Sequence, residues 1–247
     1  MTDLFGFTRN VVRARYALLT PSSFVHGYLP GWQKAVCNVV ISPAMGARFS
    51  QVLITLEQDG QCQGNTGANQ YFIYLLEGTA SVLVEERRHR LEVGSYVYLP
   101  TGKDVEIKSS VAGTKILIFQ KPYEPVSGVA SPGPLVSHER EVKGQPFLGN
   151  EDALLQVLLP DQPAFDMAVN IFTYQPGATL PFVETHIMEH GLMMLRGQGI
   201  YRLDSDWHPV QAGDVIWMAP YCPQWFVAMG KEPAAYIYYK DVNRDPM

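Results

Sequence analysis

Hydrophobic and polar residues alternate along most of the chain in short runs, rich in Val, Ile, Tyr and Phe and separated by Gly and Pro. A period of two is typical of strands with one buried face. Segments 115–120 and 235–239 are predicted to be strands from their content of Ile, Phe and Tyr. The segment from Glu151 to Leu159 could form one short helical turn before Pro160 and Pro163 end it. We expect few helices overall, so the pattern predicts an all-β protein.

This alternating pattern occurs twice, in residues 75–102 and 194–222. Gly78 and Gly94 are 16 residues apart, as are Gly197 and Gly213, and the two pairs are offset by 119 residues. Four prolines between residues 121 and 134 indicate a boundary between the two copies. The sequence therefore predicts two tandem β-barrels, residues 1–125 and 126–247.

Composition narrows the class of protein. Nineteen Lys and Arg against 24 Asp and Glu give a net charge of −5, which argues against nucleic acid and against an anionic membrane surface as partners. Hydrophobic residues make up 47% of the chain, so disorder is excluded. We find no signal peptide and no membrane span. The cysteines, Cys37, Cys62 and Cys222, predict neither a disulfide framework nor a zinc site and indicate a cytoplasmic protein.

Two of the six histidines lie close together in the second copy. His186 and His190 share parity with Glu184, so an extended segment could turn all three side chains to one side of a sheet. Burying a carboxylate with two imidazoles is costly unless a divalent metal binds them. Two histidines and one carboxylate leave coordination positions open for a small ligand. The other four histidines have no such neighbours.

The segment His186–His190 also matches H-x-x-E-H, a zinc-peptidase pattern that requires a helix. Pro181 precedes it and Gly191 follows it, which is poor helical material, so we interpret the match as accidental. Glu189 is then expected to lie behind the ligands or to face solvent.

The first copy lacks this ligand set. At the positions 119 residues before Glu184, His186 and His190 it carries Asn65, Gly67 and Tyr71. We therefore expect the N-terminal barrel to be metal-free and the C-terminal barrel to hold the metal and the active site.

Residues 177–197 resemble the first cupin motif, with Glu184 in place of the usual first His and His190 in place of the usual Glu. Residues 213–224 resemble the second motif, in which Gln224 replaces the final His. The resemblance implies a bicupin, that is, two tandem cupin barrels with one Glu-His-His-Gln ligand set.

The chain most closely resembles the (S)-ureidoglycine aminohydrolase family of allantoin catabolism, over nearly its whole length. Segments 15–21, 29–32, 42–46, 184–191 and 239–246 carry the resemblance. It implies hydrolytic release of ammonia from (S)-ureidoglycine, giving (S)-ureidoglycolate, by a homo-oligomer that contains Mn²⁺. The implied metal ligands are Glu184, His186, His190 and Gln224. The implied substrate contacts are Tyr201, Tyr236, Lys240, Glu184 and Gln224, of which Lys240 and Tyr236 are catalytic.

The residues themselves support part of this assignment. Tyr236 and Lys240 share parity on one predicted strand, and a lysine suits a substrate carboxylate. A ligand set of nitrogen and oxygen atoms accepts Mn, Fe, Ni or Zn, so manganese is implied only by the resemblance. Two alternatives stay open: a cupin dioxygenase with non-haem iron, and a bicupin that binds a small molecule without catalysis.

Overall fold

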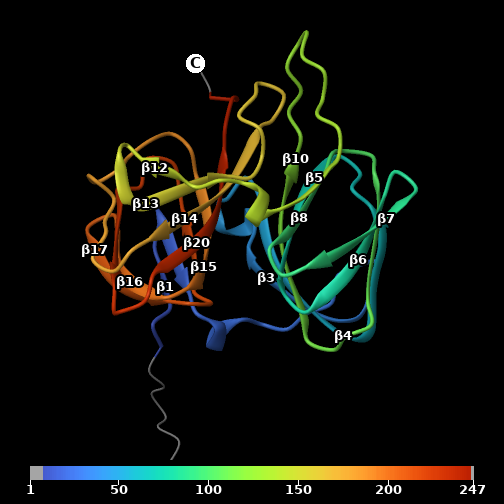
Figure 1. Cartoon of the computed structure of the whole chain (residues 1–247), viewed down its shortest axis with the longest axis horizontal. Coiled ribbons are helices and arrows are strands. Elements are labelled where there is room, and N and C mark those ends of the chain that lie inside the picture. Colours follow the sequence, from blue (N-terminus) through green and yellow to red (C-terminus); the bar gives the residue numbers. More distant parts are fainter. Residues whose placement is uncertain (1–7, 246–247) are drawn as a thin grey trace, which may run out of the picture.

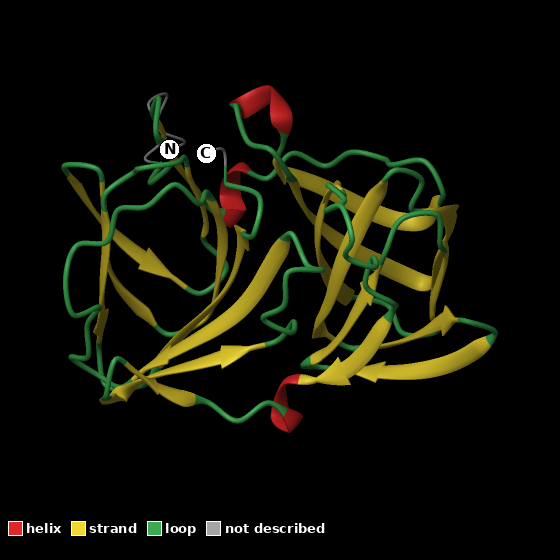
Figure 2. Cartoon of the chain, turned by 90° about the horizontal axis from the view of Figure 1, so that it is seen from above, coloured by secondary structure: helices red, strands yellow, loops and turns green. Residues whose placement is uncertain are grey.

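The computed structural model describes residues 8–245. Residues 1–7, within the stretch predicted to lack a signal peptide, and residues 246–247, which include the last proline of segment 239–246, lie outside the described range. Two β lobes lie side by side (Figures 1 and 2). The helices of the described range are short 3₁₀ turns, at Pro21–Ser23, Pro43–Met45 and Glu139–Glu141, and none could cross a membrane.

The N-lobe is one sheet in the order β11-β8-β5-β10-β4-β9-β6-β7, with β3 also paired to β4. Its strands are β3 (Trp32–Ile41), β4 (Ser50–Asn65), β5 (Asn69–Glu77), β6 (Thr79–Val84), β7 (Arg87–Glu92), β8 (Ser95–Leu99), β9 (Asp104–Ser109), β10 (Thr114–Pro122) and β11 (Leu135–His138).

The C-lobe has a large sheet in the order β1-β2-β18-β15-β20-β14-β13-β12 and a small sheet in the order β17-β16-β19. Its strands are β1 (Val11–Val12), β2 (Tyr16–Leu19), β12 (Gln145–Phe147), β13 (Asn150–Val157), β14 (Met167–Tyr174), β15 (His190–Arg196), β16 (Gln198–Leu203), β17 (Asp206–Gln211), β18 (Val215–Met218), β19 (Gln224–Met229) and β20 (Ala234–Asp241).

The structure confirms the all-β class and the internal repeat. Shifted by 119 residues, β6 and β7 coincide with β16 and β17. Gly78 and Gly197, equivalent in the repeat, both have positive φ, +79° and +71°. A Cβ on Gly78 would come within 2.9 Å of the Thr114 Cα, and one on Gly197 within 2.6 Å of the Ala234 Cα. The repeated glycines therefore mark the same tight turn in both lobes.

The two lobes exchange strands across the predicted boundary near residue 125. Near the N-terminus, β2 crosses to the C-lobe and pairs with β18, with Leu18 opposite Ile216. After residue 125 the chain returns to the N-lobe, where β11 pairs with β8 and Val136 lies opposite Val97. The sheets therefore do not divide strand by strand at this boundary.

The short helical turn expected between Glu151 and Leu159 is wrong, because this segment forms β13. It pairs with β14 on one side and β12 on the other, and Ala153, opposite Tyr174, is fully buried. Ladder hydrogen bonds and burial outweigh the modest helical preference of Glu, Ala and Leu, which is a weak prior.

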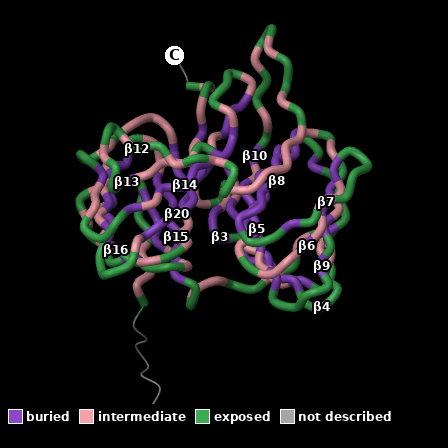
Figure 3. Tube along the Cα trace, viewed as in Figure 1, coloured by how far each residue is buried: buried purple, intermediate pink, exposed green. Residues whose placement is uncertain are grey.

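The large sheets pack against each other, and their central strands are buried on both faces (Figure 3). On β10, Leu117 faces the core between the lobes and Ile116 the core of the N-lobe. On β20, Tyr239 faces the core between the lobes, while Tyr236 and Tyr238 face into the C-lobe. This double burial explains why the central residues of these strands, 116–119 in β10 and 234–239 in β20, are all apolar or aromatic.

Candidate active site

All seven residues singled out in the sequence line one cavity of about 140 Å³ inside the C-lobe. They are Glu184, His186, His190, Tyr201, Gln224, Tyr236 and Lys240. A larger cavity of about 590 Å³ lies between the lobes and contains none of them. We place the chemistry in the smaller cavity because ionisable and hydrogen-bonding groups converge there on a mostly apolar floor.

Two histidines meet at the centre of this cavity, with Nε2 atoms 3.1 Å apart. His190 begins β15, whereas His186 belongs to an irregular loop. The Nδ1 of His186 lies 3.1 Å from the Met188 carbonyl oxygen, and the Nδ1 of His190 lies 3.2 Å from that of Tyr239. A carbonyl only accepts, so each Nδ1 carries the hydrogen and, in the neutral ring, each Nε2 presents a lone pair.

The environment favours neutral imidazoles. Burial, followed by the charges of His186 and Lys240, lowers the pKa of His190 to about 3. Burial also lowers the pKa of His186. Neutral imidazole is the form that binds metals. Burial raises the pKa of the Glu184 carboxyl, and the positive charge of Lys240 opposes that rise.

Glu184 and Gln224 are held opposite each other by their backbones. Glu184 N–H donates to the Gln224 carbonyl at 2.8 Å, and Gln224 N–H donates to the Glu184 carbonyl at 2.9 Å. The Gln224 amide nitrogen lies 3.0 Å from His186 Nε2, and the Tyr201 hydroxyl donates to the Gln224 amide oxygen at 3.4 Å. The Gln224 amide therefore contacts the histidine pair, and the Tyr201 hydroxyl orients that amide through its oxygen.

The remaining polar wall comes from β20. Lys240 lies directly opposite His190 in the strand register, and the Tyr236 hydroxyl lies 3.1 Å from that of Tyr174. The sequence interpretation missed Tyr238, which lines the same cavity and receives a hydrogen bond from the Asn170 amide at 3.1 Å. Its parity with Tyr236 and Lys240 was the signal that could have identified it.

The donor set fits a divalent cation. The Nε2 atoms of the two histidines lie 3.1 Å apart, and lone pairs that face each other at this distance repel unless a proton or cation lies between them. Within residues 8–245 no three His, Cys, Asp or Glu side chains gather as a metal site, so the carboxylate does not join the histidines as placed. Gln224 is the third group at the pair, and a half rotation of its amide would present oxygen. Glu184 offers its carboxylate from the same cavity wall.

The peptidase interpretation fails on backbone geometry, because residues 185–189 are irregular and β15 follows. Glu189 has no exposed surface, and the Trp217 indole donates to it at 3.3 Å. It lies behind His190, which is one of the two places expected for it.

Comparisons with known proteins identify the family of this chain. A family model described as "Cupin domain" matches residues 170–239. The "Probable (S)-ureidoglycine aminohydrolase" of Oryza sativa subsp. japonica is 38% identical over 252 residues, covering 100% of this chain and 79% of the relative. The "(S)-ureidoglycine aminohydrolase" of Escherichia coli strain K12 is 34% identical, covering 98% and 94%.

Among solved structures, the protein Ylba of E. coli superimposes with a TM-score of 0.87 and 32% identity, covering 97% of this chain and 96% of that one. Full-length identity at this level, together with the matching fold, establishes the relationship. The chain belongs to the (S)-ureidoglycine aminohydrolase family of cupin proteins.

Proposed function

We propose that this protein hydrolyses (S)-ureidoglycine to (S)-ureidoglycolate and ammonia in allantoin degradation. One observation carries the proposal beyond the family relationship: the seven residues implied by the resemblance converge on a single cavity. Its volume of about 140 Å³ admits only a small substrate. In the reaction, a water oxygen bonds to the carbon that carries the amine, the C–N bond breaks, and the amine leaves as ammonia with one proton from that water.

We further propose that Mn²⁺ is the cofactor and that Glu184, His186, His190 and Gln224 hold it. When bound, a divalent metal would supply positive charge and open positions that orient a ligand. The two neutral imidazoles, already 3.1 Å apart and fixed by backbone carbonyls, support this assignment. Nitrogen and oxygen donors without thiolate suit several divalent metals, Mn²⁺ among them.

The other polar groups then bind and orient the substrate. Lys240 provides a positive charge for the substrate carboxylate. Because the Tyr238 oxygen accepts from the Asn170 amide, its own proton is free to be donated into the cavity. Tyr236, braced by Tyr174, offers a second hydroxyl. Fixing the substrate against these groups recovers entropy that would otherwise add to the barrier.

The remaining parts of the proposal concern organisation. The strand-by-strand repeat supports two cupin barrels, with residues 1–125 and 126–247 as their approximate extents. Three buried free thiols suit the cytoplasm. Exposed apolar side chains beside the site, Phe182, Val183 and Tyr221, suit contact with another copy in a homo-oligomer.

The test is ammonia release from freshly prepared (S)-ureidoglycine by protein stripped of metal and then resupplied with Mn²⁺. We expect activity that depends on the metal, and its loss with metal binding in His186→Ala or Glu184→Ala. His26→Ala, outside the cavity, is the matched control and should retain both.

Other outcomes favour the alternatives. Oxygen uptake without ammonia release would favour a cupin dioxygenase. A tight small-molecule complex without turnover would favour a binding protein. Retention of metal and activity by Glu184→Ala would refute the ligand assignment.

A further inference from the structure

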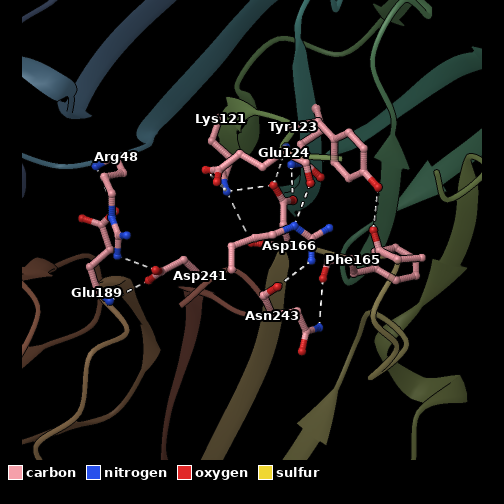
Figure 4. Close-up of polar contacts among 12 residues, drawn as sticks. Arg48, Lys121, Tyr123, Glu124, Phe165, Asp166, Glu189, Asp241 and Asn243 are labelled. Carbon is pink, nitrogen blue, oxygen red and sulfur yellow. Dashed lines mark hydrogen bonds and ion pairs between the residues drawn. The ribbon is translucent and has the colours of Figure 1, made fainter. Parts of the chain in front are cut away.

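Three residues of the N-lobe, Arg48, Phe49 and Gln51, lie directly against the strands that carry the site. Just before β4, the Arg48 backbone N–H donates to the Glu189 carboxylate at 2.8 Å, and its side-chain Nε donates to the same oxygen at 3.3 Å. The Arg48 guanidinium also donates to the Asp241 carboxylate (Figure 4). The Asp241 carboxylate in turn accepts the Glu189 backbone N–H at 2.6 Å. Arg48 thus ties β15 to β20 where they carry the site.

These contacts involve the immediate neighbours of two site residues. Glu189 precedes His190, and Asp241 follows Lys240. The carboxylate of Glu189 is fully buried, and within residues 8–245 its partners are Arg48 and the Trp217 indole. Because a buried carboxylate needs its partners, this network has little freedom to shift.

A second N-lobe contact involves Gly191, the residue that follows His190. A Cβ placed on Gly191 would come within 2.4 Å of the Phe49 ring and 2.9 Å of the Gln51 amide oxygen. The Phe49 ring also stacks on Tyr239 with centroids 4.2 Å apart. Residues 189 and 191 therefore contact the consecutive N-lobe residues Arg48 and Phe49, on the face opposite the His190 side chain.

We propose that Arg48 and Phe49 of the N-lobe are positioning residues that set the places of His190 and Lys240 in the C-lobe cavity. The part of this proposal that concerns Lys240 and the substrate rests on the proposed function. It assigns the N-lobe a role in the site, although the cavity lining found among the described residues comes entirely from the C-lobe. Groups that orient metal ligands from behind typically change metal affinity 10- to 100-fold when removed.

The chain offers a matched control. Arg9 pairs with Asp214 much as Arg48 pairs with Glu189: each arginine is partly exposed, 36% and 46%, and each carboxylate is fully buried. Asp214, however, lies four residues before Met218, the partner of His190 in the strand pairing, about 13 Å along an extended chain. Loss of the Arg9 pair removes a buried ion pair without touching the neighbours of His190.

The experiment compares Arg48→Met, Arg48→Lys and Arg9→Met in the full chain. The readouts are the ¹⁵N and ¹H signals of the His190 ring in metal-free protein, Mn²⁺ affinity by titration, kcat and KM for ammonia release, and the thermal midpoint. We expect Arg48→Met to shift the His190 signals, weaken Mn²⁺ binding about tenfold and lower kcat more than it raises KM. Arg48→Lys should recover part of each, and Arg9→Met should change only the thermal midpoint.

The proposal is overturned if Arg48→Met leaves the His190 signals and Mn²⁺ affinity as in the parent protein, or if Arg9→Met alters them equally. Should Arg48→Met fail to fold, Gly191→Ala tests the same contact through Phe49 and must shift the same signals. A parent protein that releases no ammonia would refute the proposed function, but the His190 signals involve neither substrate nor metal and would still decide the positioning role.

Discussion

Lys121 and Asp166 form a buried ion pair between the lobes, and its loss should destabilise the protein strongly. Lys121 Nζ lies 2.9 Å from an Asp166 carboxylate oxygen, and the two side chains are 4% and 0% exposed (Figure 4). Asp166 also accepts hydrogen bonds from the Glu124 backbone N–H, at 2.9 Å, and from the Gln70 amide. In Lys121→Met these two neutral donors would remain, but the buried negative charge would lose its cation.

The expected magnitude follows from this burial. Removing one partner of a buried pair costs about 3–5 kcal/mol, and the two remaining donors favour the lower end, about 3 kcal/mol. For a chain of this size that corresponds to a fall in the thermal midpoint of roughly 6–12 °C. Lys115 and Glu77 provide the comparison, with the same 2.9 Å separation but side chains 45% and 60% exposed. Lys115→Met should cost less than about 1 kcal/mol.

Differential scanning calorimetry, with urea unfolding followed by tryptophan fluorescence, measures both variants. Adding Asp166→Asn to Lys121→Met should restore part of the lost stability, because it removes the uncompensated charge. Equal losses for Lys121→Met and Lys115→Met would refute the reasoning, since they would show that burial does not decide the strength of the pair.

Three further predictions concern hydroxyl and thiol groups. Tyr238→Phe should lower kcat for ammonia release about tenfold with the fold intact. Tyr239→Phe is the control and should not lower kcat, because the Tyr239 hydroxyl is buried on the opposite face and has no partner among residues 8–245; equal activities would contradict the role given to Tyr238. Burial raises the pKa of several tyrosines, that of Tyr16 to about 12, so above pH 10 the unfolded chain loses phenol protons that the folded one keeps. Stability should therefore fall as pH rises beyond 10, and the part of the absorbance increase at 295 nm that comes from the buried tyrosines should accompany unfolding rather than precede it. Burial raises the pKa of the Cys62 thiol to about 12, so iodoacetamide at pH 8 should label it only at the rate of unfolding, which mass spectrometry can follow; rapid labelling of native protein would count against that burial.

Much of the fold and of the candidate site could be predicted from the sequence, because both depend on local patterns. Alternation and glycine spacing gave the strands and the repeat, and motif spacing identified residues that share one cavity, such as His190 and Gln224. The segment beginning at Glu151 was predicted incorrectly, because its helical preference was judged without the two strands that pair with it.

Tyr238 and Tyr239 show where local pattern becomes insufficient. Both are buried, one towards the cavity and one towards the core between the lobes, so hydrophobicity alone does not distinguish the faces of β20. Parity with Lys240 resolves the ambiguity only once Lys240 is known to face the site.

The sequence by itself determined the β class, the repeat and the residue types available for chemistry, since each follows from short-range spacing. Only the tertiary structure decided the strand exchange between the lobes and the placing of Arg48 against Glu189 and Asp241. These contacts join residues 141 and 193 positions apart. They form because two sheets with apolar outer faces must bury those faces against each other, and the polar groups at the edge of that contact must then find partners across it.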